Sequence, residues 1–182
     1  MVRFGSLGSA LAMVLAVAVC AGCGSSGSSK ISAGTYVGTV CSAISPLERD
    51  VVSRSSALNS TTAPNAAQAK KALRGFLVAV EGDASRALSK IQSAGTPDIS
   101  NGKTVAGTIT KTFTELRDTL RAAITKSNSL PTDSPTSFRT AAQALGANVK
   151  SSLNGIDSSG LTNPDLQKAA AGQAACKSLS SS

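Results

Sequence analysis

Four long segments of this 182-residue chain place apolar side chains at spacings of three and four residues. An α-helix turns once every 3.6 residues, so this spacing gathers the apolar side chains on one face of a helix. The segments cover residues 33–60, 64–94, 102–129 and 134–156, and a shorter helix is expected over 163–177. The sequence therefore predicts a protein built mainly from helices.

Several helix boundaries are marked by residue type. Gly95 and Pro97 end the second expected helix, because Gly favours the position just past a helix and Pro cannot continue one. Asn101 is a candidate cap for the third helix. Ser134 followed by Pro135 is typical of a helix start and begins the fourth.

Three stretches disturb the helical pattern. Ser45-Pro46-Leu47-Glu48 has the residue order of a helix start, which predicts a kink or a short break within the first helix. Residues 34–40 (GTYVGTV) and 104–110 (TVAGTIT) combine β-branched residues with glycine, a composition that favours strands. An α+β fold is the alternative that they support. Each stretch continues a longer helical pattern, so helix is the prediction.

The connections between the expected helices are short, so neighbouring helices should run antiparallel. The predicted fold class is all-α: an up-and-down four-helix bundle with a short C-terminal helix. Four antiparallel helices return the chain to the end where the first helix began. This places Cys176 near Cys41.

The N-terminus has the features of a secretory signal. Arg3 supplies a positive charge, and residues 7–19 (LGSALAMVLAVAV) are apolar and uncharged. A permanent membrane-spanning helix needs about 20 residues, so this run is too short. A positive start, a short apolar run and small residues after it indicate export and removal of the segment.

The sequence Ala21-Gly22-Cys23 resembles a bacterial lipobox, in which small residues precede the cysteine that receives diacylglycerol. The lipobox usually has Leu where this chain has Cys20. Cleavage after Ala18, at a small-x-small pattern, is the alternative. The preferred prediction is a signal peptide at 1–22, the lipidated Cys23 with a flexible Gly/Ser tether at 23–31, and a helical domain at 32–182.

The four cysteines have different expected fates, according to their positions in the chain. Cys20 leaves with the signal and Cys23 takes the lipid, which leaves Cys41 and Cys176. Outside the cytoplasm, two remaining cysteines are expected to oxidise to each other. A reactive thiol is the alternative, but no activating neighbour is visible. The prediction is one structural disulfide between Cys41 and Cys176.

Histidine and tryptophan are absent from the chain, and both methionines, Met1 and Met13, lie in the signal. A Ser-His-Asp triad, a His zinc site and His/Met haem ligation are therefore excluded. A di-iron bundle needs Glu-x-x-His pairs, and an EF-hand needs an acid-rich loop. The prediction is no cofactor, no metal site and no catalytic residue, so the protein is not expected to be an enzyme.

Carboxylate pairs are the remaining candidates for acid–base chemistry. The pairs are Glu48/Asp50, Glu81/Asp83 and Glu115/Asp118. Only the last has the i,i+3 spacing that places both acids on one helix face. Surface ion pairs Asp118–Arg121 and Asp50–Arg54 are expected, and a solvated charged face is the preferred interpretation.

The chain has 18 Lys+Arg against 10 Asp+Glu, and loss of Arg3 leaves 17 against 10, an excess of +7. This charge favours an anionic membrane surface or wall polymer, although an ordinary soluble surface is the simpler interpretation. Nucleic acid is excluded as a partner, since an exported protein does not meet it and stacking aromatics are scarce. Basic residues group at Lys70, Lys71 and Arg74, and at Lys111, Arg117, Arg121 and Lys126.

The aromatic residues after the expected signal, Tyr36, Phe76, Phe113 and Phe138, fall roughly one to each expected helix. They could line a pocket for an apolar ligand between the helices. Filling a core that is otherwise rich in Ala is the preferred interpretation.

Several of these features occur together: Ala21-Gly22-Cys23, the segment Tyr36-Val37…Val40-Cys41…Pro46-Leu47-Glu48, Cys176, and a bias toward Ala, Ser, Thr and Gly. In them the chain resembles the uncharacterised small secreted lipoproteins of actinobacteria. The resemblance spans most of the chain. It implies an envelope location and a Cys41–Cys176 bridge, and it implies no activity.

The sequence thus predicts a non-catalytic cell-envelope lipoprotein, anchored in the cell membrane at its extracytoplasmic face. It would act as a binding or interaction module toward an envelope protein, a wall polymer or the membrane. The alternative is a carrier that binds a lipid or another apolar small molecule between the helices. A dry, Phe-lined void favours the carrier, and a packed core favours the module.

Overall fold

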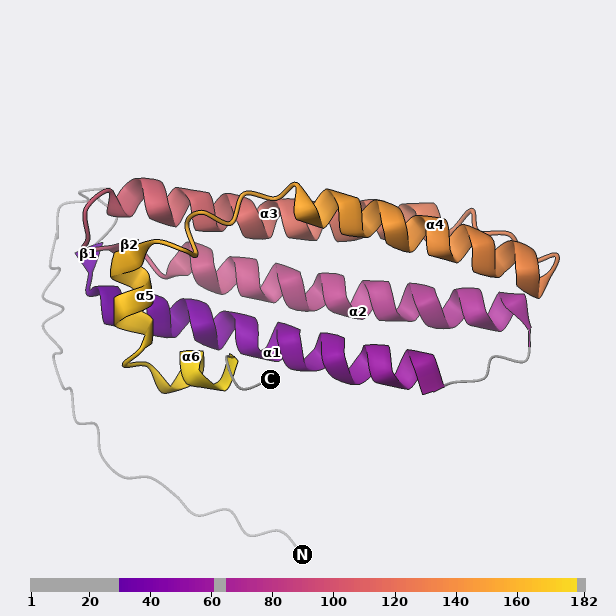
Figure 1. The fold of residues 1–182 in the computed structure, drawn as a ribbon, viewed down its shortest axis with the longest axis horizontal. Coiled ribbons are helices and arrows are strands. Elements are labelled where there is room, and N and C mark those ends of the chain that lie inside the picture. Colours follow the sequence, from indigo (N-terminus) through magenta and orange to yellow (C-terminus); the bar gives the residue numbers. More distant parts are fainter. Residues whose placement is uncertain (1–29, 61–64, 180–182) are drawn as a thin grey trace, which may run out of the picture.

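The computed structural model describes residues 30–60 and 65–179, so the expected signal peptide and Cys23 lie outside the described residues. The elements in chain order are β1 (Lys30–Ile31), α1 (Ala33–Ser60), α2 (Ala66–Ser93), β2 (Thr96–Pro97), α3 (Gly102–Ser127), α4 (Pro135–Asn154), α5 (Pro164–Ala170) and α6 (Ala174–Leu179). Helices α1 to α4 alternate in direction along the bundle (Figure 1). The predicted all-α, up-and-down bundle is confirmed.

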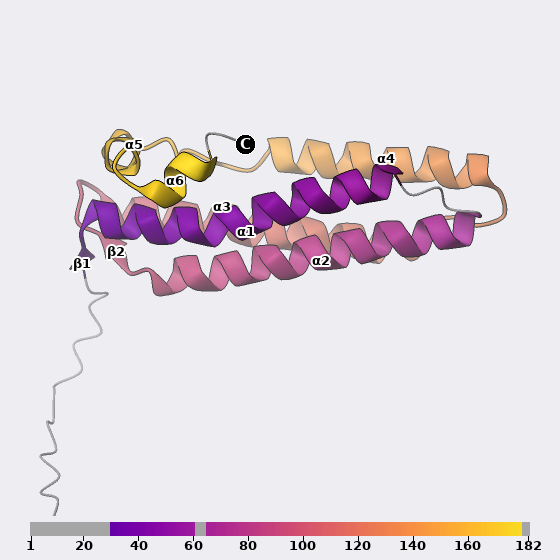
Figure 2. The ribbon, with the colours of Figure 1, turned by 90° about the horizontal axis from the view of Figure 1, so that it is seen from below.

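The helices form an elongated bundle in which α2 is central. Helix α2 packs against both α1 and α3, while α4 packs mainly on α3, and α5 and α6 pack on α1. Figures 1 and 2 show α4 along one half of the bundle and the α5–α6 pair along the other half. The fourth layer is therefore shared between α4 and the two short helices.

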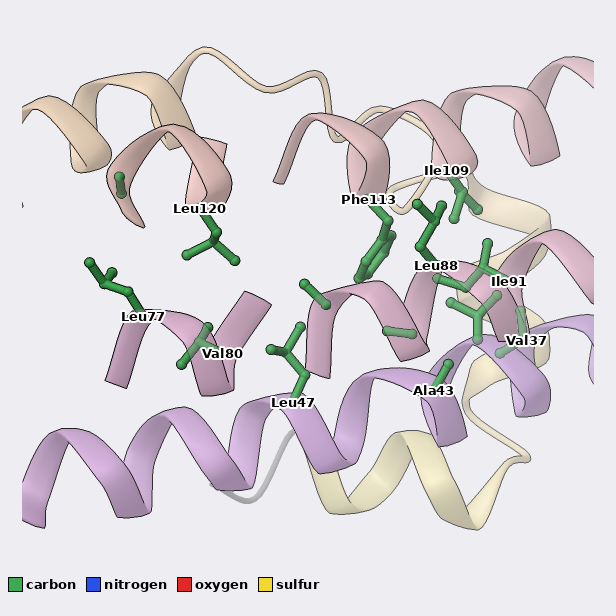
Figure 3. Close-up of a cluster of buried hydrophobic side chains, with 14 of the residues drawn as sticks. Val37, Ala43, Leu47, Leu77, Val80, Leu88, Ile91, Ile109, Phe113 and Leu120 are labelled. Atoms are coloured by element: carbon green, nitrogen blue, oxygen red, sulfur yellow. The ribbon is translucent and has the colours of Figure 1, made fainter. Parts of the chain in front are cut away.

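The core is made mainly of apolar side chains from the first three helices. Figure 3 shows Leu47, Val80 and Leu120 pointing toward one another from α1, α2 and α3. Ile91 and Ile109 occupy the half of the core nearer the start of α1, and both are almost fully buried. Removing this apolar surface from water is the main stabilising contribution to such a bundle.

Helix α1 shows how the structure treats a proline inside a helix. The predicted short break does not occur, because α1 continues through Pro46 to Ser60. Proline has no N–H to donate to the carbonyl one turn earlier. The preceding Ser45 hydroxyl donates to the carbonyl of Cys41, four residues before it, at 3.0 Å. Figure 2 shows the two halves of α1 running in different directions, as expected of a helix that contains proline.

The two stretches that favour strands by composition are helical, within α1 and α3. In α1 the glycines make room for Gln173, which lies between α5 and α6. A Cβ added to Gly38 would lie 2.9 Å from Gln173 Oε1, and one added to Gly34 would lie 3.1 Å from Gln173 Nε2. Glycine in this stretch thus permits close packing and does not mark a strand.

Two details at the chain ends differ from the prediction. The single C-terminal helix expected over 163–177 is two short helices, α5 and α6. Lys30 and Ile31, expected to belong to the tether, form β1 and pair in parallel with β2. The backbone N–H of Asp98 donates to the Ile31 carbonyl at 2.7 Å. Lys30 and Ile31 thus pair with a segment of the helical domain.

The predicted disulfide is confirmed. Cys41 and Cys176 are joined by an S–S bond of 2.05 Å across 135 residues of sequence. Helix α6 has only 6 residues, too few for a stable isolated helix. The disulfide therefore holds α6 against α1.

Candidate functional site

A groove of about 570 Å³ lies between α3 and α4 and is open to solvent. Its apolar lining includes Leu145 and Val149, which are four residues apart and so lie on one face of α4. Helix α4 ends at Asn154, and Gly155 and Ile156 also line the groove as the chain turns away. The polar lining consists of Glu115, Asp118, Thr119, Lys126, Asn148, Ser151 and Ser152.

The two carboxylates of the groove are each paired with a cation. Glu115 lies 3.6 Å from Lys111, and Asp118 lies 2.8 Å from Arg117. This arrangement agrees with the solvated charged face expected for Glu115 and Asp118. Lys126 has no ion-pair partner within the described part of the chain. The groove thus offers apolar side chains, hydroxyl and amide groups, and one unpaired cation.

The predicted Asp118–Arg121 ion pair is wrong. Arg121 donates instead to Glu81 of α2, with 2.8 Å between Nε and Oε1. Ser85 donates to the same oxygen at 2.9 Å. The side chain of Glu81 is only 18% exposed, so this pair links α2 to α3 from a largely buried position.

The acids Glu81 and Asp83 are separated by the structure, although they are close in sequence. Glu81 faces α3, whereas Asp83 is 5% exposed and lies beside Asp50 of α1. Asp83 is paired with Arg86, and its Oδ2 has no hydrogen-bond partner. The predicted Asp50–Arg54 pair is confirmed at 3.1 Å. The hydrogen bond from Arg54 is the main cause that lowers the pKa of Asp50.

Two members of the predicted basic groups have a structural role at the end of α3. Lys70 Nζ donates to the carbonyls of Asn128 and Leu130 at 2.7 and 2.9 Å. Arg74 Nε donates to Asn128 Oδ1 at 3.0 Å. The last carbonyls of a helix lack helical donors and carry partial negative charge, so both cations stabilise this helix end.

The phenylalanine side chains are distributed through the molecule. Phe113 is buried in the core, where Figure 3 shows it among the aliphatic side chains near Leu88. Phe76 lines a small surface pocket with residues of α1 and α2. Phe138 lines another surface pocket, between the starts of α2 and α4. These three rings therefore do not surround a common cavity.

Tyr36 is the most fully buried large side chain of α1. It is 0% exposed, and its hydroxyl has no hydrogen-bond partner in the described structure. Burial raises the pKa of Tyr36 to about 12. Removal from water disfavours the phenolate, so Tyr36 serves as a neutral core residue.

The described residues, 30–60 and 65–179, contain no group of three or more side chains suited to hold a metal ion. Within the same ranges, no helix combines the length and apolar character needed to cross a bilayer. Sequence reasoning singled out Glu115, Asp118 and Lys126, which the structure brings to the groove. It missed Asn148, Ser151 and Ser152, because single polar residues on an exposed helix face form no motif.

No protein-family model, no curated protein and no solved structure matches this chain.

Proposed function

We propose that the protein is a non-catalytic binding module of the cell envelope, exported, lipidated at Cys23 and held at the extracytoplasmic face of the membrane. The observation that carries the binding role is the groove between α3 and α4. The signal-like start and Ala21-Gly22-Cys23 support the proposed export and lipid anchoring. The Cys41–Cys176 disulfide supports it further, since disulfides persist in oxidising compartments.

The groove supports binding because of what lines it. Apolar side chains such as Leu145 and Val149 can bury apolar surface of a partner, and the surrounding hydroxyl and amide groups can fix its orientation. Glu115 and Asp118 are paired with Lys111 and Arg117, as in an ordinary solvated charged face. An envelope protein or a wall polymer is the partner class that this open surface favours over an enclosed small molecule.

The carrier alternative calls for a void surrounded by aromatic side chains. Phe76 and Phe138 instead line separate surface pockets, and Phe113 belongs to the packed core. We therefore rank the carrier below the binding module.

Site-specific photo-crosslinking in cells tests the proposal. A photoreactive amino acid at Ser152 lies in the groove, and the matched control at Val78 lies on the exposed face of α2. We expect a discrete crosslinked envelope component from position 152 and none from position 78. Ala122→Trp, which fills the groove, should abolish the crosslink. Recovery of a stoichiometric lipid with no crosslinked partner would overturn the ranking in favour of the carrier.

The proposed export and lipidation are tested separately. Labelled palmitate or glycerol should enter the wild-type protein and should not enter Cys23→Ser. An unprocessed, unlabelled product in the cytosol would remove the basis for the envelope role.

A further inference from the structure

We propose that the end of the bundle that carries β1 docks on an anionic lipid surface through three exposed lysines, Lys90, Lys103 and Lys168. This inference rests on the proposed anchoring at Cys23. It adds a second contact between the domain and the membrane, and it gives the domain an orientation in which the α3–α4 groove stands away from the bilayer.

The three lysines come from different elements but share one end of the molecule. Lys90 lies in the last turn of α2, Lys103 in the first turn of α3 and Lys168 in the last turn of α5. Figure 1 shows β1, β2, α5 and the start of α3 at the same end of the bundle. All three lysines are exposed, and none has an ion-pair partner within the described residues.

Chain length keeps this end close to the proposed anchor. Lys30, the first residue of β1, is seven residues after Cys23, and an extended chain reaches at most about 25 Å over that distance. Helix α1 has 28 residues, which places its far end about 40 Å away along the bundle. Charges are screened beyond about 8 Å at physiological salt. Only the β1 end can therefore contact headgroups when the domain stands upright.

The charge at this end is complementary to anionic headgroups. Lys30 is paired with Asp98 at 3.2 Å, and Asp165 lies in the first turn of α5. Among the described residues named here, four lysines therefore accompany two carboxylates. Each lysine at an anionic membrane surface strengthens binding by about fivefold. A single lipid chain anchors a protein only reversibly, and a basic surface beside it is the kind of second contact that makes anchoring stable.

Lysine footprinting on vesicles tests the docking. The mature chain from Cys23, with the Cys41–Cys176 disulfide intact, is coupled through the Cys23 thiol to a maleimide lipid. The vesicles contain either phosphatidylcholine alone or phosphatidylcholine with phosphatidylglycerol. Acetylation of each lysine by a water-soluble reagent is then followed by mass spectrometry. We expect Lys90, Lys103 and Lys168 to be acetylated about fivefold more slowly on the anionic vesicles, with the protection lost at high salt.

Two charge-reversal variants of equal net charge provide the control. Lys30, at the same end, should also be protected in the wild type and serves as the reporter. Lys90→Glu/Lys103→Glu/Lys168→Glu should abolish this protection of Lys30. Lys71→Glu/Lys126→Glu/Arg139→Glu changes three exposed cations elsewhere and should leave that protection intact.

Two outcomes overturn the proposal: equal acetylation of the three lysines on both kinds of vesicle, or equal loss of protection in the two variants. The second outcome would show an effect of net charge alone. Because Cys23 is coupled chemically, failure of the docking is distinguishable from failure of lipidation in cells.

Discussion

The ammonium group of Lys70, near the start of α2, donates a hydrogen bond of 2.9 Å to the carbonyl of Leu130, which follows the end of α3. The same group reaches the Asn128 carbonyl at 2.7 Å. One side chain thus satisfies two carbonyls beyond the helical ladder of α3, 58 and 60 residues away in sequence. The contact ties the start of α2 to the turn between α3 and α4, and so helps to position α4.

Replacing this cation should destabilise the bundle. Lys70→Met keeps the length of the side chain and removes the donor, so the two carbonyls lose their protein partner. We expect the free energy of unfolding to fall by about 1–2 kcal/mol. Urea denaturation followed by circular dichroism measures it. Lys71→Met, an exposed neighbour, should change the same quantity by less than about 0.5 kcal/mol. Equal effects of the two variants would show that the contact contributes nothing.

Opening the disulfide should loosen α6 more than the rest of the bundle. The bond between Cys41 and Cys176 closes a loop of 135 residues. Its loss should lower the free energy of unfolding by about 3–5 kcal/mol. Denaturation of Cys41→Ser/Cys176→Ser measures this change. Amide hydrogen exchange should rise first in α6, whose helix is too short to persist alone. Unchanged protection of α6 in the variant would contradict this view of the disulfide.

The tyrosinate absorbance of the native protein should titrate well above the ordinary range. Tyr36 is the single tyrosine of the chain, so the tyrosinate absorbance reports this residue alone. Burial raises its pKa from 10.0 to about 12. A raised pKa means that the stability contributed by the neutral phenol is fully present below pH 10.0 and is lost as the pH rises toward 12.

The rise of the pKa from 10.0 to about 12 corresponds to a loss of about 3 kcal/mol in the free energy of unfolding. The Tyr36→Phe variant cannot ionise at this position. Its free energy of unfolding should therefore fall less than that of the wild type as the pH rises from 10 to 12. A native titration midpoint near 10 would contradict the buried, unpartnered hydroxyl.

Two glycines of α3 should respond to alanine in opposite directions. A Cβ on Gly102 would lie 2.0 Å from the Pro97 carbonyl oxygen, which belongs to the backbone and cannot move aside easily. We expect Gly102→Ala to lower the free energy of unfolding by about 2 kcal/mol or more. Gly107 has nothing within 4 Å of a Cβ, so Gly107→Ala should raise it by about 0.5–1 kcal/mol through helix propensity. Thermal unfolding of the two variants measures the difference. The same sign for both would contradict the close approach of β2 to α3.

The candidate site shows where sequence reasoning stops. Glu115 and Asp118 could be placed on one face of a helix, because their spacing is a local property. Their position beside Leu145 and Val149 depends on how α4 packs against α3. The spacing of residues along the sequence does not reveal this packing. For the same reason the local spacing wrongly predicted that Arg121 pairs with Asp118. Its partner in the structure is Glu81, 40 residues away in sequence.

The sequence alone determined the four long helices, their approximate ends and the pairing of Cys41 with Cys176. The helices follow from periodicity and capping residues, which are local properties over one or two turns. The cysteine pairing follows from elimination of the other cysteines. Only the tertiary structure decided that α1 continues through Pro46 and that Lys30 and Ile31 pair with β2. It also decided that the C-terminal segment forms two helices, α5 and α6, in place of one. Each of these depends on neighbours that come from distant parts of the chain, and the rotation and offset of packed helices determine which neighbours meet.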